Sequence, residues 1–124
     1  MDKKSIILNE IPVTFTKSVN GELGSKVECR PSDIHGVGLF AKVDIGENFD
    51  IHQTHVIHPK HGVANIKPNN LYNHSSKSPN CEVVKVDNFY HLFSLRKIKA
   101  GEELLVDYGQ HKEIESPKEG WKYY

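Results

Sequence analysis

Apolar and polar residues alternate only over short stretches, and no segment shows the sustained three-to-four-residue periodicity of an amphipathic helix. β-Branched and aromatic residues instead gather in short runs, which glycine, proline, asparagine and serine separate. The predicted strands are 6–8, 13–16, 26–29, 49–51, 55–57, 82–86, 90–95 and 103–107. This pattern predicts a mainly β domain, with one weak helical signal at 112–115.

Two local features refine that picture. Asn20-Gly21 is a strong two-residue turn signal, so residues 5–30 are expected to begin with a β-hairpin. Residues 43–49 (VDIGENF) also align with residues 98–104 (IKAGEEL). Each copy has a Gly-Glu pair before a β-rich segment, and each glycine suits the left-handed position of a tight turn. The chain is therefore expected to build the same strand–turn–strand unit twice.

Composition narrows the class of protein. The 124 residues are enough for one domain, and 16 basic residues balance 16 acidic ones, with a pI near 7.1. A neutral balance argues against binding nucleic acid through a basic surface. No apolar run is long enough for a membrane span and no signal peptide is evident, so a cytosolic, soluble chain is expected. Cys29 and Cys81 are interpreted as unlinked, half-buried thiols, with a disulfide between them as the alternative.

Three segments could carry chemistry. In segment 35–41, Gly36 and Gly38 would let the backbone approach a ligand closely, or would simply form a turn. Asn73 and His74, with Pro79-Asn80-Cys81 after them, offer donors and acceptors for a polar small molecule, or cap a loop. The third segment is GEEL at 101–104 followed by DYG at 107–109. Its tyrosine would fill the core or place a phenolic oxygen in a site.

Together and in this order, the three segments resemble the motifs of the SET-domain protein lysine methyltransferases, over residues 26–109. The small size is similar to that of the shortest members, of viral and bacterial type. The resemblance implies a mainly β fold, the SET-domain (β-clip) fold, of small curved sheets with a threaded C-terminal segment. The implied organisation is an N-terminal strand or hairpin extension over 1–25, the SET domain over 26–109 and a tail over 110–124.

The resemblance also implies a reaction, the transfer of a methyl group from S-adenosylmethionine to the side-chain amine of a lysine in a protein substrate. Tyr108 matches the family's catalytic tyrosine and would orient the reacting groups. The residues implied to bind the cofactor are Gly36, Val37, Gly38, Asn73, His74 and Tyr108. We add Trp121 as a hypothesis: it would fold back and stack on the adenine, whereas the alternative is that it fills an edge of the core.

The expected partner is a protein or peptide lysine, with no nucleic acid, membrane or metal. The stretch between Ile51 and Asn73 is too short for the family's usual inserted subdomain, so peptide recognition is the least defined feature. A homodimer that covers exposed β edges is left open. The expected location is the cytoplasm, or the host cell if a virus encodes the chain.

Two other interpretations come from different classes. His52, His55, His58 and His61 recur every third residue, which suggests a metal site or a solvated, pH-sensitive face. We favour the solvated face, because residues three apart on a strand point to opposite sides. The second alternative is a catalytically weak SET-like module that binds a peptide or the cofactor without turnover.

Overall fold

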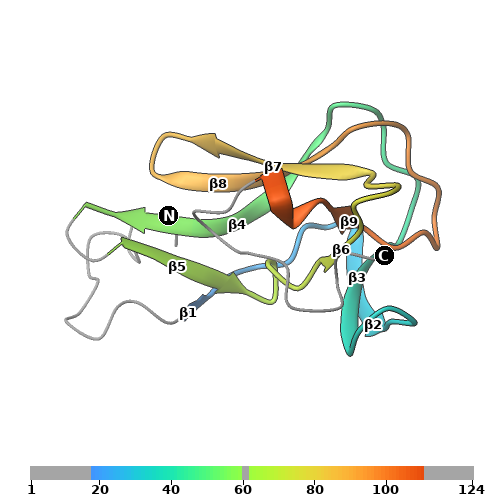
Figure 1. Cartoon of the computed structure of the whole chain (residues 1–124), viewed down its shortest axis with the longest axis horizontal. Coiled ribbons are helices and arrows are strands. Elements are labelled where there is room, and N and C mark those ends of the chain that lie inside the picture. The colour runs from blue at the N-terminus through green and yellow to red at the C-terminus, as the bar shows by residue number, and fades with distance from the viewer. Residues whose placement is uncertain (1–17, 60–61, 111–124) are drawn as a thin grey trace.

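The computed structural model describes residues 18–59 and 62–110, and this part of the chain is built mostly of strands (Figure 1). It contains nine strands, one 3-10 helix and no α-helix, so the mainly β prediction is confirmed. The strands are β1 (Ser18–Asn20), β2 (Val27–Pro31), β3 (Val37–Ala41), β4 (Asp50–His58), β5 (Gly62–Lys67), β6 (Asn73–His74), β7 (Cys81–Val86), β8 (Phe89–Ser94) and β9 (Leu105–Val106). The 3-10 helix η1 (Tyr108–Gln110) follows β9 directly. No helix in these residues is long and apolar enough to cross a membrane.

The strands form two sheets. The larger has the order β1-β5-β4-β8-β7-β9-β6, and β2 pairs with β3 in a separate antiparallel ribbon. That ribbon stands at the end of the molecule where β6 and β9 lie (Figure 1). An isolated bridge between Phe40 and Glu103 ties the ribbon to the segment that leads into β9. Three motifs are therefore brought to one end of the fold: the glycine motif (35–41), the Asn-His motif (73–74) and the C-terminal motif (101–109).

Strand β9 lies between β6 and β7 and is parallel to both. The Ser75 amide donates to the Val106 carbonyl at 3.0 Å, and the Asn80 amide donates to the Leu105 carbonyl at 3.0 Å. The two arms of the loop between β6 and β7 thus hydrogen-bond to the same late strand. This is the threaded C-terminal segment that the resemblance implied, and it joins residues that are 25 to 32 positions apart along the chain.

Several sequence predictions need correction. Asn20-Gly21 does not form a hairpin turn, because β1 pairs in parallel with β5 and the next strand, β2, belongs to the other sheet. The strands predicted at 49–51 and 55–57 are one strand, β4. Strand β5 was not predicted, because its Gly62 was interpreted only as a turn residue. The strands predicted at 6–8 and 13–16, and the helix predicted at 112–115, lie outside the described residues.

The two similar Gly-Glu segments lie side by side and pair with each other. Ile45 and Ile98 exchange backbone hydrogen bonds of 2.8 and 2.9 Å, and Asp44 Oδ1 accepts from the Ala100 amide at 2.9 Å. The expected left-handed glycine occurs in one copy only: Gly101 has φ +94°, whereas in the other copy the positive φ falls at Asn48. The repeat is therefore a pair of facing turns, and each places an isoleucine in the core.

The main core forms where these turns meet the sheets. Its fully buried side chains include Leu39, Leu92, Leu104 and the two facing isoleucines. A smaller cluster of Val56, Ala64 and Ile66 lies between β4 and β5.

The two cysteines are unlinked, so the alternative of a disulfide is wrong. Cys29 is exposed on β2, whereas Cys81 is buried, and burial raises the pKa of its thiol to about 12. They are therefore not two half-buried thiols, as expected, but one surface thiol and one core residue.

Candidate active site

The glycine motif forms the turn before β3 and the start of that strand. Gly36 has φ +48°, a backbone conformation that favours glycine, and its carbonyl accepts from the Ser32 amide at 2.8 Å. Gly38 has a different reason to be glycine. A Cβ at this position would collide with the Glu103 carboxylate and would lie 3.0 Å from Asn73 Nδ2. In this motif, Gly36 is needed for its backbone conformation, and Gly38 is needed because a side chain there would collide with other side chains.

Asn73 lies at the start of β6, with 5% of its surface exposed. Its Nδ2 donates to the Glu103 carboxylate at 2.7 Å and to the carbonyls of His35 and Val37 at 3.1 and 3.5 Å. The side-chain amide therefore bridges the glycine motif and the GEEL segment. The structure brings these three parts of the sequence together, as the resemblance implied.

His74 and Tyr108 are also neighbours. The Tyr108 amide donates to His74 Nδ1 at 3.0 Å, and the two ring centroids are 5.0 Å apart. Because Nδ1 accepts this hydrogen bond, the ring hydrogen is on Nε2, and that buried nitrogen has no hydrogen-bond partner among residues 18–59 and 62–110. The mid-chain histidine thus fixes the backbone of the tyrosine.

Tyr108 is 6% exposed, and its hydroxyl donates to the Tyr72 carbonyl at 2.7 Å. Its ring packs edge-on against the Tyr72 ring, with centroids 5.8 Å apart. Donation to a carbonyl uses the hydroxyl hydrogen, and a phenolic oxygen can accept hydrogen bonds as well as donate one. This arrangement suits a group that orients a neighbour by accepting hydrogen bonds, and it does not suit a base.

The predicted site residues are thus distributed as follows. Gly36, Val37, Gly38, Asn73, His74 and Tyr108 meet at one end of the fold, and Trp121 lies outside the described residues. Their roles in binding or catalysis remain predictions.

Three contributors to the site were not predicted from the sequence. Glu103 binds Asn73 and Ser32, and Asn80 uses its side chain to hold both Glu103 and Leu105. Glu103 and Asn80 stood inside the quoted motifs, and that position was the available signal, whereas the third contributor, Ser32, stood before the glycine motif.

The histidines do not form the solvated face that was expected. His52 is largely buried: Nδ1 accepts from the Gly24 amide at 2.9 Å and Nε2 donates to the Asn69 carbonyl at 3.0 Å. Burial lowers the pKa of His52 to about 4. His55 is fully buried, and its Nδ1 lies 2.7 Å from the Thr54 hydroxyl.

Two irregularities of β4 explain this difference. The register against β8 shifts between Asp50 and His52 and again between Gln53 and His55. Such shifts break the simple alternation of strand faces on which the prediction relied. His58 is half-buried, and His61 lies outside the described residues. Among the described residues, no group of three or more His, Cys, Asp or Glu side chains could hold a metal ion.

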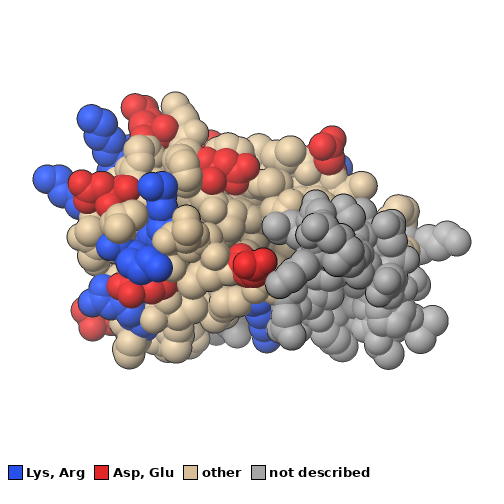
Figure 2. Space-filling view, turned by 180° about the vertical axis from the view of Figure 1, so that it is seen from behind, with Lys and Arg blue, Asp and Glu red and all other residues tan. Residues whose placement is uncertain are grey.

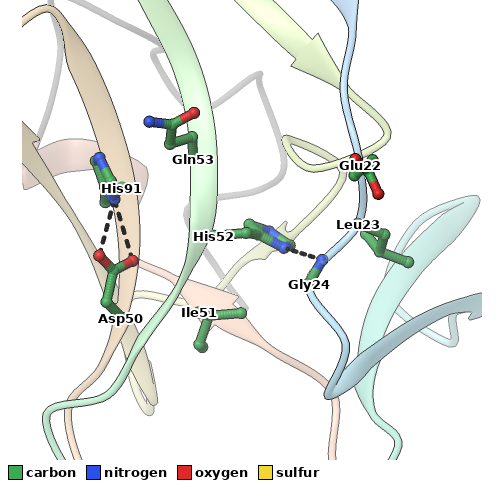
Figure 3. Close-up of a pocket in the computed structure, with 8 residues that line it drawn as sticks. All are labelled: Glu22, Leu23, Gly24, Asp50, Ile51, His52, Gln53 and His91. Carbon is green, nitrogen blue, oxygen red and sulfur yellow. Dashed lines mark hydrogen bonds and ion pairs between the residues drawn. The ribbon is translucent and has the colours of Figure 1, made fainter. Parts of the chain in front are cut away.

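A polar cavity of about 380 Å³ lies beside His52, between β4 and the segment that leads to β2 (Figure 3). The imidazole of His91 on β8 borders it, with Nδ1 3.0 and 3.1 Å from the two carboxylate oxygens of Asp50. None of its lining residues belongs to the three motifs. This cavity is therefore distinct from the motif site, the place where the glycine, Asn-His and C-terminal motifs meet.

Comparison with known proteins identifies the fold family. The SET-domain family profile matches residues 47–109, which is 63 of the 124 residues. The chain belongs to the SET-domain family. No curated protein sequence matches it. Among solved structures, the SET domain resembles a crystal structure from Plasmodium falciparum described as a candidate histone methyltransferase. The TM-score is 0.53 at 20% identity, and the match covers 68% of this chain and 93% of the other, which shows a shared fold.

The SET-domain match includes two of the three motifs, the Asn-His segment and the GEEL–DYG segment. The glycine motif lies before the matched residues, and the structure connects it to them through Asn73 and Glu103. The assignment to the family and the geometry of the site therefore agree.

Proposed function

We propose that this SET domain is a methyltransferase that uses S-adenosylmethionine and methylates the side-chain amine of lysine in a protein substrate. Membership of the SET-domain family supports the proposal, and so does the description of the Plasmodium neighbour. The observation that carries it is the parallel pairing of β6 with β9, which places His74 against Tyr108, while the neighbouring Asn73 contacts the glycine motif and Glu103.

The residues present are suited to the cofactor. Among the described residues, the Asn73 side-chain oxygen accepts no hydrogen bond, so an acceptor is available to a ligand donor beside the glycine motif. Val37 is 49% exposed at the start of β3, which leaves the backbone of the motif accessible. Gly36, Val37, Gly38, Asn73 and His74 would hold the cofactor. When bound, S-adenosylmethionine supplies a methyl group that its sulfonium has already activated.

The remaining work of the protein is alignment and desolvation. A free lysine amine has a pKa of about 10.4, and a dry channel disfavours the ammonium form, so the amine becomes a nucleophile on entry. The Tyr108 hydroxyl donates a hydrogen bond to the Tyr72 carbonyl, and a phenolic oxygen can also accept, so this oxygen can orient the amine. Tyr108 therefore acts by positioning, without proton abstraction.

The direct test is incubation of the purified chain with methyl-labelled S-adenosylmethionine and a protein extract, followed by amino-acid analysis of the labelled proteins. Label in methylated lysine supports the proposal. Label in another residue would contradict the lysine assignment.

A non-catalytic module is the second candidate, because only fourteen residues (59–72) separate β4 from β6, which limits the frame for a peptide. Saturable cofactor binding without any transfer of label would favour that module over the enzyme. The surface shown in Figure 2 carries Lys and Arg interspersed with Asp and Glu in its described part. It therefore gives no support to a nucleic-acid-binding function on this face.

A further inference from the structure

Glu103 is a charged side chain held between the elements of the motif site. One carboxylate oxygen, Oε1, accepts from the Ser32 hydroxyl at 2.9 Å, and the other, Oε2, accepts from Asn73 Nδ2 at 2.7 Å. Its backbone is fixed as well, because its carbonyl accepts from Asn80 Nδ2 at 2.8 Å. Each oxygen of this carboxylate therefore contacts a different segment of the site.

The contact with Asn73 determines the orientation of its side-chain amide. Around Nδ2 lie three acceptors: the Glu103 carboxylate and the carbonyls of His35 and Val37. An amide turned by 180° would place its oxygen against all three, where no donor is present and like partial charges repel. The carboxylate is the shortest and the only charged of these contacts, so it contributes most to the preference. Asn73 Oδ1 is left as the acceptor that faces away from Glu103.

The contact with Ser32 fixes the turn before the glycine motif. The Ser32 hydroxyl donates to Glu103 and also accepts from the Ile34 amide at 3.0 Å, while the Ser32 amide donates to the Gly36 carbonyl. The turn that sets the left-handed Gly36 is thus attached to the same carboxylate as Asn73. Gly38, whose missing side chain leaves room for this carboxylate, completes the arrangement.

We propose that Glu103 is a positioning residue of the cofactor site, which presents Asn73 Oδ1 as a hydrogen-bond acceptor and holds the Ser32 turn beside it. The part of the cofactor that meets Asn73 is therefore a donor, such as an ammonium, a hydroxyl or an amine. This inference rests on the proposed function for the identity of the ligand, but the orientation of Asn73 can be measured without any ligand.

Glu102 provides a matched control. It precedes Glu103 directly, but its side chain is 39% exposed and pairs with Arg96 at 3.4 Å and with the Lys99 amide at 2.7 Å. Glu102→Ala removes one negative charge, as Glu103→Ala does, but it removes no contact with Asn73 or Ser32.

The first experiment is NMR of the full-length, isotope-labelled chain without ligand. The side-chain amide signals of Asn73 are assigned by their loss in Asn73→Asp. We expect one downfield, slowly exchanging amide proton with a coupling across the hydrogen bond to the Glu103 carboxylate carbon. This signature should persist in Glu102→Ala and disappear in Glu103→Ala. A wild-type chain that lacks the coupling would overturn the proposal, even if Glu103→Ala does not fold.

The second experiment is calorimetric binding of S-adenosylmethionine. A hydrogen bond to a charged group contributes enough that Glu103→Ala should weaken binding about 10- to 100-fold. Glu102→Ala should stay within about threefold of wild type. Glu103→Gln should recover most of the lost affinity, because its side-chain oxygen can still accept from Asn73 and its amide can donate to Ser32.

The outcomes separate the two proposals. Wild-type protein that binds no S-adenosylmethionine contradicts the proposed function, whatever the NMR result. Wild-type protein that binds it, with Glu103→Ala and Glu102→Ala equally affected, contradicts the role of Glu103 alone.

Discussion

Replacement of Asn80 by alanine should remove the main side-chain support of β9. Asn80 is 2% exposed, and its side chain makes two contacts with the segment that enters this strand. Its Nδ2 donates to the Glu103 carbonyl at 2.8 Å, and its Oδ1 accepts from the Leu105 amide at 2.8 Å. An alanine leaves that carbonyl and that amide without their partners.

The size of the effect follows from those two groups. A buried donor or acceptor that loses its partner costs about 1–3 kcal/mol, so two of them lower the free energy of unfolding by about 2–6 kcal/mol. The total stability of a domain is only about 5–15 kcal/mol. Asn80→Ala should therefore unfold at a much lower urea concentration than wild type.

The assay is urea unfolding followed by circular dichroism. Asn88→Ala is the control, because Asn88 lies exposed in the turn between β7 and β8 and should change the stability by less than about 0.5 kcal/mol. If Asn80→Ala lies within about 1 kcal/mol of this control, the reasoning about β9 is refuted.

Three further predictions concern the site, the buried histidine and the tail. Gly38→Ala introduces a Cβ that collides with the Glu103 carboxylate, so it should lower the free energy of unfolding by about 1–3 kcal/mol. The control is Gly46→Ala, whose Cβ enters open space and should leave the free energy of unfolding unchanged. Equal urea midpoints for the two variants would contradict the contact between Gly38 and Glu103. His52 has a folded pKa of about 4 against an ordinary value of 6.5, so the unfolded chain binds the proton more readily. Its contribution to stability is complete above pH 6.5 and is lost, by about 3 kcal/mol, as the pH falls to about 4. Urea unfolding at several pH values should show this loss reduced in His52→Gln, and an unchanged slope would count against the buried neutral ring. Trp121→Ala should weaken calorimetric S-adenosylmethionine binding if the indole stacks on adenine, and equal affinity would remove that hypothesis.

The sequence was sufficient for the class of fold and for the meeting of the motifs. Short β-branched runs predicted β7 and β8 within a residue or two at each end, because a hairpin of alternating residues is encoded locally. The resemblance implied that Asn73 and His74 approach Tyr108; the structure shows His74 in contact with Tyr108 through the pairing of β6 with β9, whereas the Asn73 side chain contacts the glycine motif and Glu103.

The features that the sequence could not show depend on contacts between residues far apart along the chain. The irregularities of β4 exist only relative to β8, so the burial of His52 and His55 could not be read from their spacing. Asn20-Gly21 has the residues of a hairpin turn, but Gly21 donates to the Lys67 carbonyl and β1 pairs with β5 instead. Here tertiary pairing overrides a local turn preference.

Gly38 illustrates the same limit within the site. Its residue type was interpreted either as a means of close approach by a ligand or as part of a turn, whereas the structure shows a side chain in that space, the Glu103 carboxylate. The sequence separation of 65 positions hides that contact. The need for glycine at this position is visible only in the folded structure.

The most direct test of the central claim is a comparison of wild type and Tyr108→Phe in methyl transfer to lysine, measured by mass spectrometry, with S-adenosylmethionine binding measured in parallel. The account predicts that wild type adds methyl groups to lysine, and that Tyr108→Phe binds the cofactor normally but transfers at least about 100-fold more slowly. Transfer by Tyr108→Phe at the wild-type rate, or no transfer to lysine by wild type that binds the cofactor, would contradict it.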